Sequence, residues 1–300
     1  MLKIERSRRE RPRLAIVYGE PGIGKTTLAA RLPGCLLVDL EDRAGHVDVD
    51  VVRVDSWLAL RATVREIATA DIPHRVVAID TIDRAQDLAT AWLCAERGWD
   101  TLDTPGYGRG YVELRAAMLA LADDIMDVIA AGRGVLLLAH AQRQRVEDPA
   151  QGEWDRWGVR LHDAPRSSVA AVYVERADIV ALAAMAVVRV GDRDARVQRA
   201  RVSGRMLYTT PSAARLAKAV GVEAVDIPLD DAPAWLSAAL VPAAPAADQD
   251  PGRAAYARLE RVLGSREAVR ALLRERGLSP RSMRAEDWIA LAEEIEEVPQ

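Results

Sequence analysis

The sequence predicts an α/β fold in which helices flank a mainly parallel central sheet. From Arg13 onward, short and continuously apolar runs alternate with helical stretches, a pattern typical of parallel strands that are buried on both faces. One of these runs leads straight into a glycine-rich loop that is followed by a helix, the setting in which parallel sheets bind ligands. The chain of 300 residues is long enough for one such domain and a small appendage.

The expected elements follow in order along the chain. We expect strands at 14–18, 35–39, 49–54, 76–80, 134–140, 179–190, 195–203 and 206–209, most of which are apolar runs. We expect helices at 27–32, 57–70, 85–97, 111–131, 167–176 and 212–220. Glycines indicate an irregular segment at 98–110, and the polar composition of 141–165 predicts a long loop.

The predicted domain boundaries follow changes in composition. Residues 1–12 form a basic lead-in, which is either a solvated segment or an arm for nucleic acid. Residues 13–240 form the core, 241–252 form a linker rich in proline and alanine, and 253–300 form a small all-helical tail. In the tail, one helical face carries a basic stripe, so this segment either binds DNA or a partner or packs on the core. The stripe consists of Arg266, Arg270 and Arg274.

Composition excludes several classes of protein. The net charge of -4 excludes a strongly basic nucleic-acid binder, so contact with DNA requires local patches. Two cysteines, Cys35 and Cys94, indicate neither a disulfide framework nor a zinc site, as in proteins of a reducing cytosol. No apolar run reaches the roughly 18 residues that cross a membrane, so we expect a cytoplasmic protein without a membrane partner.

The glycine-rich loop matches the phosphate-binding pattern G-x-x-x-x-G-K-[ST], the Walker A motif, at every fixed position. Its expected nucleotide-binding residues are Gly19, Glu20, Pro21, Gly22, Ile23, Gly24, Lys25, Thr26 and Thr27. The glycines let consecutive backbone N–H groups point at phosphate oxygens, Lys25 places a positive charge against the outer phosphates, and the Thr26 hydroxyl ligates Mg²⁺. The sequence therefore predicts ATP and Mg²⁺ as cofactors.

Two carboxylates follow apolar strands at the edge where parallel sheets bind ligands. Asp80 ends the strand 76–80 in the manner of a Walker B motif, and we expect it to hold Mg²⁺ with Thr26, the alternative being a helix N-cap. Glu41 follows the strand 35–39, where a carboxylate polarises the water that attacks the terminal phosphate. Asp39 or Asp42 is an alternative for this role, and a solvated acidic turn is another interpretation.

His140 ends the strand 134–140 and is the third expected catalytic residue beside Glu41 and Lys25. An imidazole at this position can sense the terminal phosphate and signal to the segment behind it. The alternative is a polar residue whose hydrogen bonds are satisfied within the fold.

The polar segment 141–165 combines arginines with Trp154 and Trp157. Arginines between aromatic rings suit single-stranded DNA, because the rings stack on bases and the guanidinium groups pair with phosphates. The arginines are Arg143, Arg145, Arg156 and Arg160, and the acidic residues that balance them are Glu147, Asp148, Glu153 and Asp155. A disordered loop or a subunit contact is the alternative.

Lysine is rare in this chain and occurs only at Lys3, Lys25 and Lys218. Lys218 falls in the helix expected at 212–220, where a long flexible side chain could reach across a subunit interface to the terminal phosphate. An ordinary surface lysine is the alternative.

Several of these segments resemble the RecA-type recombinases. Residues 37–41 resemble their strand with the catalytic glutamate, 77–81 their Walker B strand, and 136–140 the strand that leads into their second DNA-binding loop. Over residues 13–220 the chain is similar to phage-encoded RecA-like nucleotide-binding proteins, which share the Tyr107-Gly108 step, a strand ending in histidine and the acidic step at 177–179. RecA itself has a polar amide where this chain has His140.

The resemblance implies a RecA-like P-loop ATPase that acts on single-stranded DNA in phage recombination or annealing, in the cytoplasm of a bacterial host. It also implies self-association into a ring or a filament, with ATP bound between subunits. Two other functions fit the phosphate loop: a P-loop kinase of a small metabolite, and a non-enzymatic nucleotide-dependent switch or loader.

Overall fold

The computed structural model describes residues 11–150, 152–190, 199–242, 251–263, 265–278 and 283–296. The chain divides into two compact units, of which the larger comprises Arg11–Pro242. The smaller unit contains the described helices that follow Ala243. Most of the lead-in and of the linker, together with residues 195–198 of an expected strand, lies outside the described residues.

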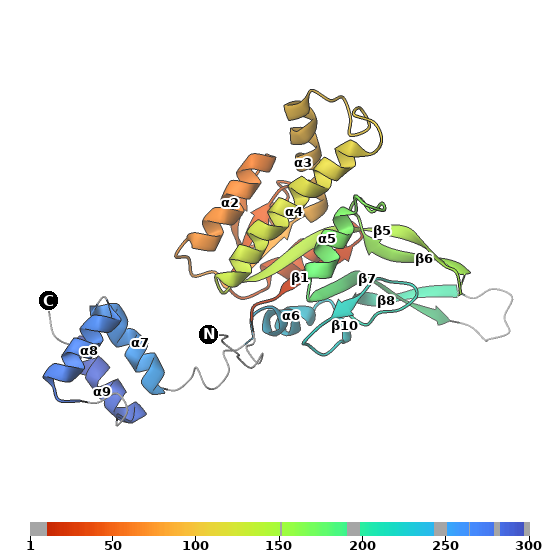
Figure 1. Cartoon of the computed structure of the whole chain (residues 1–300). Helices are drawn as coiled ribbons and strands as arrows, with labels where there is room; N and C mark the ends of the chain where they lie inside the picture. The colour runs from red at the N-terminus through yellow and green to blue at the C-terminus, as the bar shows by residue number, and fades with distance from the viewer. Residues whose placement is uncertain are drawn as a thin grey trace. The chain divides into compact units, whose positions relative to one another are not determined.

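The larger unit contains a central sheet with the strand order β10-β8-β7-β1-β5-β4-β2-β3 (Figure 1). Its strands are β1 Leu14–Gly19, β2 Cys35–Asp39, β3 Asp50–Arg53, β4 Val76–Asp80, β5 Gly134–Asp148, β7 Ile179–Val190, β8 Arg199–Tyr208 and β10 Asp226–Pro228. From β7 to β3 all neighbouring strands are parallel, whereas β8 and β10 are antiparallel additions. The predicted mainly parallel sheet is confirmed.

Helices cover both faces of this sheet. They are α1 Lys25–Ala30, α2 Trp57–Thr69, α3 Ile82–Arg97, α4 Arg109–Ala130, α5 Val169–Arg176 and α6 Ala232–Leu240, with a short 3₁₀ turn at Ala44–His46. Figure 1 shows α2, α3, α4 and α5 on one face and α6 on the other. Side chains of β1 alternate between the two cores: Ile16 and Tyr18 pack on the first face, and Ala15 and Val17 on the second.

The prediction of a loop at 141–165 is wrong, because most of this segment forms a β-hairpin. β5 continues to Asp148 and pairs antiparallel with β6, Gly152–Val159, from Ala141↔Val159 to Asp148↔Gly152. Polar side chains dominate residues 141–148 and β6, so the apolar run that identified the first half of β5 is missing here. Backbone hydrogen bonds of the ladder, rather than burial, define this hairpin.

The prediction of a helix at 212–220 is also wrong. Lys218–Ala219 form the short strand β9, which pairs with Val180 and Ile179 of β7. Upstream of β9, the backbone of Trp157 accepts from Leu216 and donates to Ala214. Long-range backbone pairing thus replaces the local helical bonds that the sequence pattern favoured.

The smaller unit has a core of its own. Its helices are α7 Pro251–Leu263, α8 Arg266–Glu275 and α9 Ala285–Glu296. Its buried residues include Leu259, Val269, Leu273 and Trp288. The rings of Trp288 and Tyr256 pack edge to face, with their centroids 5.2 Å apart. Across all described residues, no helix combines the length and apolarity needed to cross a membrane.

Candidate active site

The phosphate loop joins β1, which ends at Gly19, to α1, which begins at Lys25. Gly22 and Gly24 have φ angles of 77° and 111°, in the left-handed region that favours glycine. Gly19 is required for a different reason, since a Cβ there would lie 2.4 Å from the carbonyl oxygen of Ala183 on β7. The glycines of the motif therefore permit both the curl of the loop and its close approach to the sheet.

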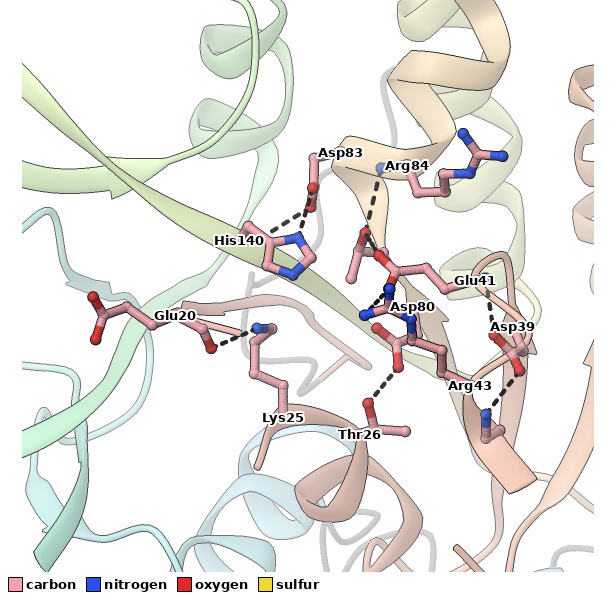
Figure 2. A network of polar contacts seen from close by, with 12 residues as sticks. Glu20, Lys25, Thr26, Asp39, Glu41, Arg43, Asp80, Asp83, Arg84 and His140 are labelled. Atoms are coloured by element: carbon pink, nitrogen blue, oxygen red, sulfur yellow. Dashed lines mark hydrogen bonds and ion pairs between the residues drawn. The ribbon is translucent and has the colours of Figure 1, made fainter. Parts of the chain in front are cut away.

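Lys25 lies inside this curl. Its Nζ donates to the carbonyl oxygens of Gly19 and Glu20 at 3.0 and 3.1 Å (Figure 2), and the residue is 7% exposed. Burial lowers the pKa of Lys25, and the nearby carboxylates of Asp80, Asp83 and Glu41 act in the opposite direction. The ammonium group is thus fixed beside the loop in the position expected for a phosphate-binding lysine.

Thr26 and Asp80 meet across the site. The Thr26 hydroxyl donates to Asp80 Oδ2 at 2.6 Å, and Asp80 is buried at the end of β4. Burial raises the pKa of Asp80, although the hydrogen bond from Thr26 lowers it. The helix N-cap is Thr81 instead, whose hydroxyl accepts from the backbone N–H of Arg84 at 3.3 Å. The alternative role of Asp80 as a cap is therefore excluded.

The Thr26–Asp80 pair suits Mg²⁺, which proteins commonly bind through one or two carboxylates while phosphates and water supply the other oxygens. No group of three or more metal-ligating acidic, histidine or cysteine side chains occurs in the described ranges.

Glu41 follows β2 and faces the same cavity. Its Oε1 accepts from the Thr81 hydroxyl at 3.1 Å, and its Oε2 lies 3.7 Å from Nη1 of Arg43. Asp39 is turned away and accepts from the backbone N–H groups of Glu41 and Ala44. The side chain of Asp42 is 85% exposed and pairs with Arg53. Of these three carboxylates, Glu41 is the one that lines the cavity over the phosphate loop.

This cavity has a volume of about 310 Å³ and brings together residues that are distant in sequence. Its lining includes the phosphate loop, Glu41, Asp80, His140 and Arg205. A neighbouring cavity of about 460 Å³ shares Glu41 and His140 and adds Arg160. Both cavities lie at the carboxyl ends of β1, β2, β4 and the parallel part of β5.

His140 is held by Asp83, a residue whose role sequence reasoning missed. Asp83 accepts from the backbone N–H of His140 at 2.9 Å, and its Oδ2 lies 2.8 Å from the imidazole Nδ1 (Figure 2). Nη2 of Arg160 reaches the same Oδ2 at 2.5 Å. Burial alone would raise the pKa of Asp83, but the hydrogen bonds of His140 and the charge of Arg160 hold it below its usual value. His140 is therefore both hydrogen-bonded within the fold and part of the cavity wall.

Trp154 and Trp157 lie on β6, three residues apart, so their side chains leave opposite faces of the hairpin. Trp157 packs against the main core, and the guanidinium of Arg143 lies 5.2 Å from its ring centroid. Arg145 forms an ion pair with Glu153 on the exposed side. The two rings therefore do not form one stacking stripe.

Lys218 does not extend as a free arm. Its Nζ donates to the carbonyl oxygens of Val174 and Glu175 at 3.2 and 3.1 Å, in the last turn of α5. The lysine thus stabilises the carboxyl end of that helix. This position argues against the predicted cation donated to a neighbouring subunit.

Arg205 was also missed by sequence reasoning. It lies on β8, almost two hundred residues after the loop that it contacts, and no local pattern distinguishes it from the other arginines of the chain.

Comparison with known protein families agrees with this geometry. A family model described as an AAA domain matches residues 11–219, which is more than two thirds of the chain. No curated protein matches the sequence. The matched range contains the phosphate loop, Asp80 and Glu41, and the chain belongs to the AAA domain family of P-loop ATPases.

Proposed function

We propose that this protein is a Mg²⁺-dependent ATPase in which Glu41 orients the attacking water. The observation that carries the proposal is the convergence of Glu41 and the Thr26–Asp80 pair on one cavity above the phosphate loop. Lys25 and the loop backbone bind the phosphates, and Thr26 and Asp80 hold the metal. When bound, Mg²⁺ neutralises charge on the phosphate oxygens.

Glu41 acts as the general base in this proposal. Its carboxylate accepts a proton from a water placed in line with the terminal phosphate, while the hydroxyl of Thr81 fixes the orientation of the carboxylate. His140 faces the same cavity and senses the terminal phosphate, because the bond between Nδ1 and Asp83 leaves the opposite ring nitrogen for a ligand.

We further propose that this ATPase acts on single-stranded DNA, as the resemblance to phage RecA-like proteins implies, and that the DNA regulates hydrolysis. Support comes from the two ends of the hairpin. His140 begins the extension of β5, Arg160 follows β6, and Asp83 contacts both side chains. A change at the terminal phosphate therefore has a short path to the hairpin. In the same proposal, subunits assemble into a ring or a filament for recombination or annealing.

The test measures phosphate release with Mg²⁺-ATP, with and without oligo-dT, and compares the wild type with Lys25→Ala as the control for contaminating activity. We expect hydrolysis that oligo-dT stimulates, and binding of oligo-dT that weakens with salt. Hydrolysis without any effect or binding of oligo-dT overturns the DNA proposal. Nucleotide binding without hydrolysis favours the switch, and transfer of phosphate to a small acceptor favours the kinase.

A further inference from the structure

Arg205 is a charged side chain that contacts the phosphate loop from a distant part of the sheet. It lies opposite Met185 on the antiparallel pair β7–β8, and β7 neighbours the strand that leads into the loop. Its Nη1 lies 3.5 Å from the carbonyl oxygen of Ile23. A Cβ at Gly24 would meet the same Nη1 at 3.0 Å. The guanidinium therefore packs directly against the second half of the loop.

Asp230 orients this guanidinium. Nη2 of Arg205 lies 3.0 and 3.4 Å from the two carboxylate oxygens of Asp230, and Arg31 approaches the same carboxylate at 3.6 Å. These bonds and the contact with Ile23 are three interactions, whereas a guanidinium has five N–H groups. Arg205 thus keeps donor capacity, and it is one of the residues that line the cavity.

The Arg205–Asp230 pair leaves the arginine able to bind a further anion. The side chains are 40% and 67% exposed, so water screens the pair and its attraction is weak. A fixed guanidinium fork is well suited to phosphate oxygens, with which it forms charge-assisted, two-pronged hydrogen bonds.

The strand order indicates which part of a nucleotide Arg205 would meet. β8 lies on one side of β1, whereas β5, β4 and β2, which position His140, Asp80 and Glu41, lie on the other. In the proposed function, the terminal phosphate lies beside these three residues. Arg205 approaches from the opposite side of the loop and therefore faces the phosphates nearer the nucleoside.

We infer that Arg205 is a nucleotide-contacting residue that binds the inner phosphates, those shared by ADP and ATP, in the same subunit. The inference rests on the proposed nucleotide site and adds a binding residue that the phosphate-loop motif does not contain. Because both nucleotides carry these phosphates, removal of Arg205 should weaken the binding of ADP and of ATP by the same factor.

The experiment measures dissociation constants for Mg²⁺-ADP and for a Mg²⁺-bound non-hydrolysable ATP analogue by calorimetry. Arg205→Ala should raise both constants by about tenfold, the scale of a charged hydrogen bond at a partly exposed site. Arg205→Lys, which keeps the charge but not the fork, should fall between this variant and the wild type. Arg31→Ala is the matched control, since it removes the other arginine at Asp230, and it should bind like the wild type.

Three outcomes separate the possibilities. Wild-type affinity in Arg205→Ala overturns the inference and leaves the proposed function intact. An equal loss of affinity in Arg31→Ala also overturns it, because the effect would then come from the ion pairs that Arg205 and Arg31 form with Asp230 rather than from a phosphate contact. Failure of the wild type to bind either nucleotide overturns the proposed function itself. If Arg205→Ala does not fold, Arg205→Gln keeps amide donors near Ile23 and Asp230 and still removes the charge.

Discussion

Replacement of Glu41 by glutamine removes one charge from the cavity, and with it the ion pair to Arg43, but keeps the size of the side chain. The Oε1 atom of Glu41 accepts a hydrogen bond from the Thr81 hydroxyl at 3.1 Å, and the amide oxygen of glutamine can accept the same bond. The variant should therefore fold and bind ATP like the wild type. It should lose the negative charge that draws a proton from the attacking water.

The expected loss in kcat is at least about tenfold, and general-base effects extend to about 10⁴-fold. Each factor of ten corresponds to about 1.4 kcal/mol in the activation free energy. The side chain of Glu41 is 19% exposed, so bulk water screens its charge only in part. The loss in kcat should therefore exceed about tenfold.

The assay combines steady-state phosphate release, the dissociation constant of a non-hydrolysable ATP analogue, and thermal unfolding. Asp42→Asn is the matched control, because this neighbouring carboxylate is exposed and pairs with Arg53 on the surface. It should hydrolyse ATP at the wild-type rate. Normal hydrolysis by Glu41→Gln would refute the assignment of Glu41 as the general base. If Asp42→Asn is inactive, Asp42 is the general base instead.

The remaining predictions concern other parts of the chain. Lys25→Ala should abolish nucleotide binding or hydrolysis with the fold intact, which calorimetry and circular dichroism would check together. Asp83→Asn should be less stable than the wild type at neutral pH. Because the pKa of Asp83 is lowered in the folded state, this difference should shrink as the pH falls below about 4, the ordinary aspartate value, and a constant difference from pH 7 to pH 3 would contradict the reasoning. Lys218→Ala should cost about 1 kcal/mol in the free energy of unfolding through the lost bonds to α5, and it should hydrolyse ATP at the wild-type rate, because its ammonium group binds α5 rather than a phosphate. Trp288→Ala should destabilise the small helical unit by about 3–5 kcal/mol, which calorimetric scans of the full-length variant and wild type would check.

Local sequence pattern sufficed for the parallel part of the sheet and for the phosphate loop. Strands such as β1 and β4 are buried on both faces, so each appears as an uninterrupted apolar run. The loop is identifiable because its chemistry depends on consecutive backbone groups, and these are adjacent in sequence as well as in space. The positions of Glu41 and Asp80 at the sheet edge were predicted for a related reason, since Asp80 ends β4 and Glu41 lies two residues after β2.

Elements whose stability comes from distant partners were not predicted. Residues 141–148 of β5, together with β6 and β9, depend on backbone pairing between strands and contain no long apolar run. Lys218 was assigned to a helix for the same reason, although its ammonium group instead binds the end of α5.

The polar network around the cavity depends entirely on tertiary structure. Asp83 joins His140 to Arg160 across 77 positions of the sequence, and Arg205 contacts Ile23 across 182. A charged side chain has no periodic signature, and its partner is chosen by which elements the sheet order places side by side. The sequence by itself determined the phosphate loop, its strand and the two carboxylates that follow strands. Only the folded sheet decided which of the other charged residues face the nucleotide site, because those contacts arise between strands and helices that the chain connects through long crossovers.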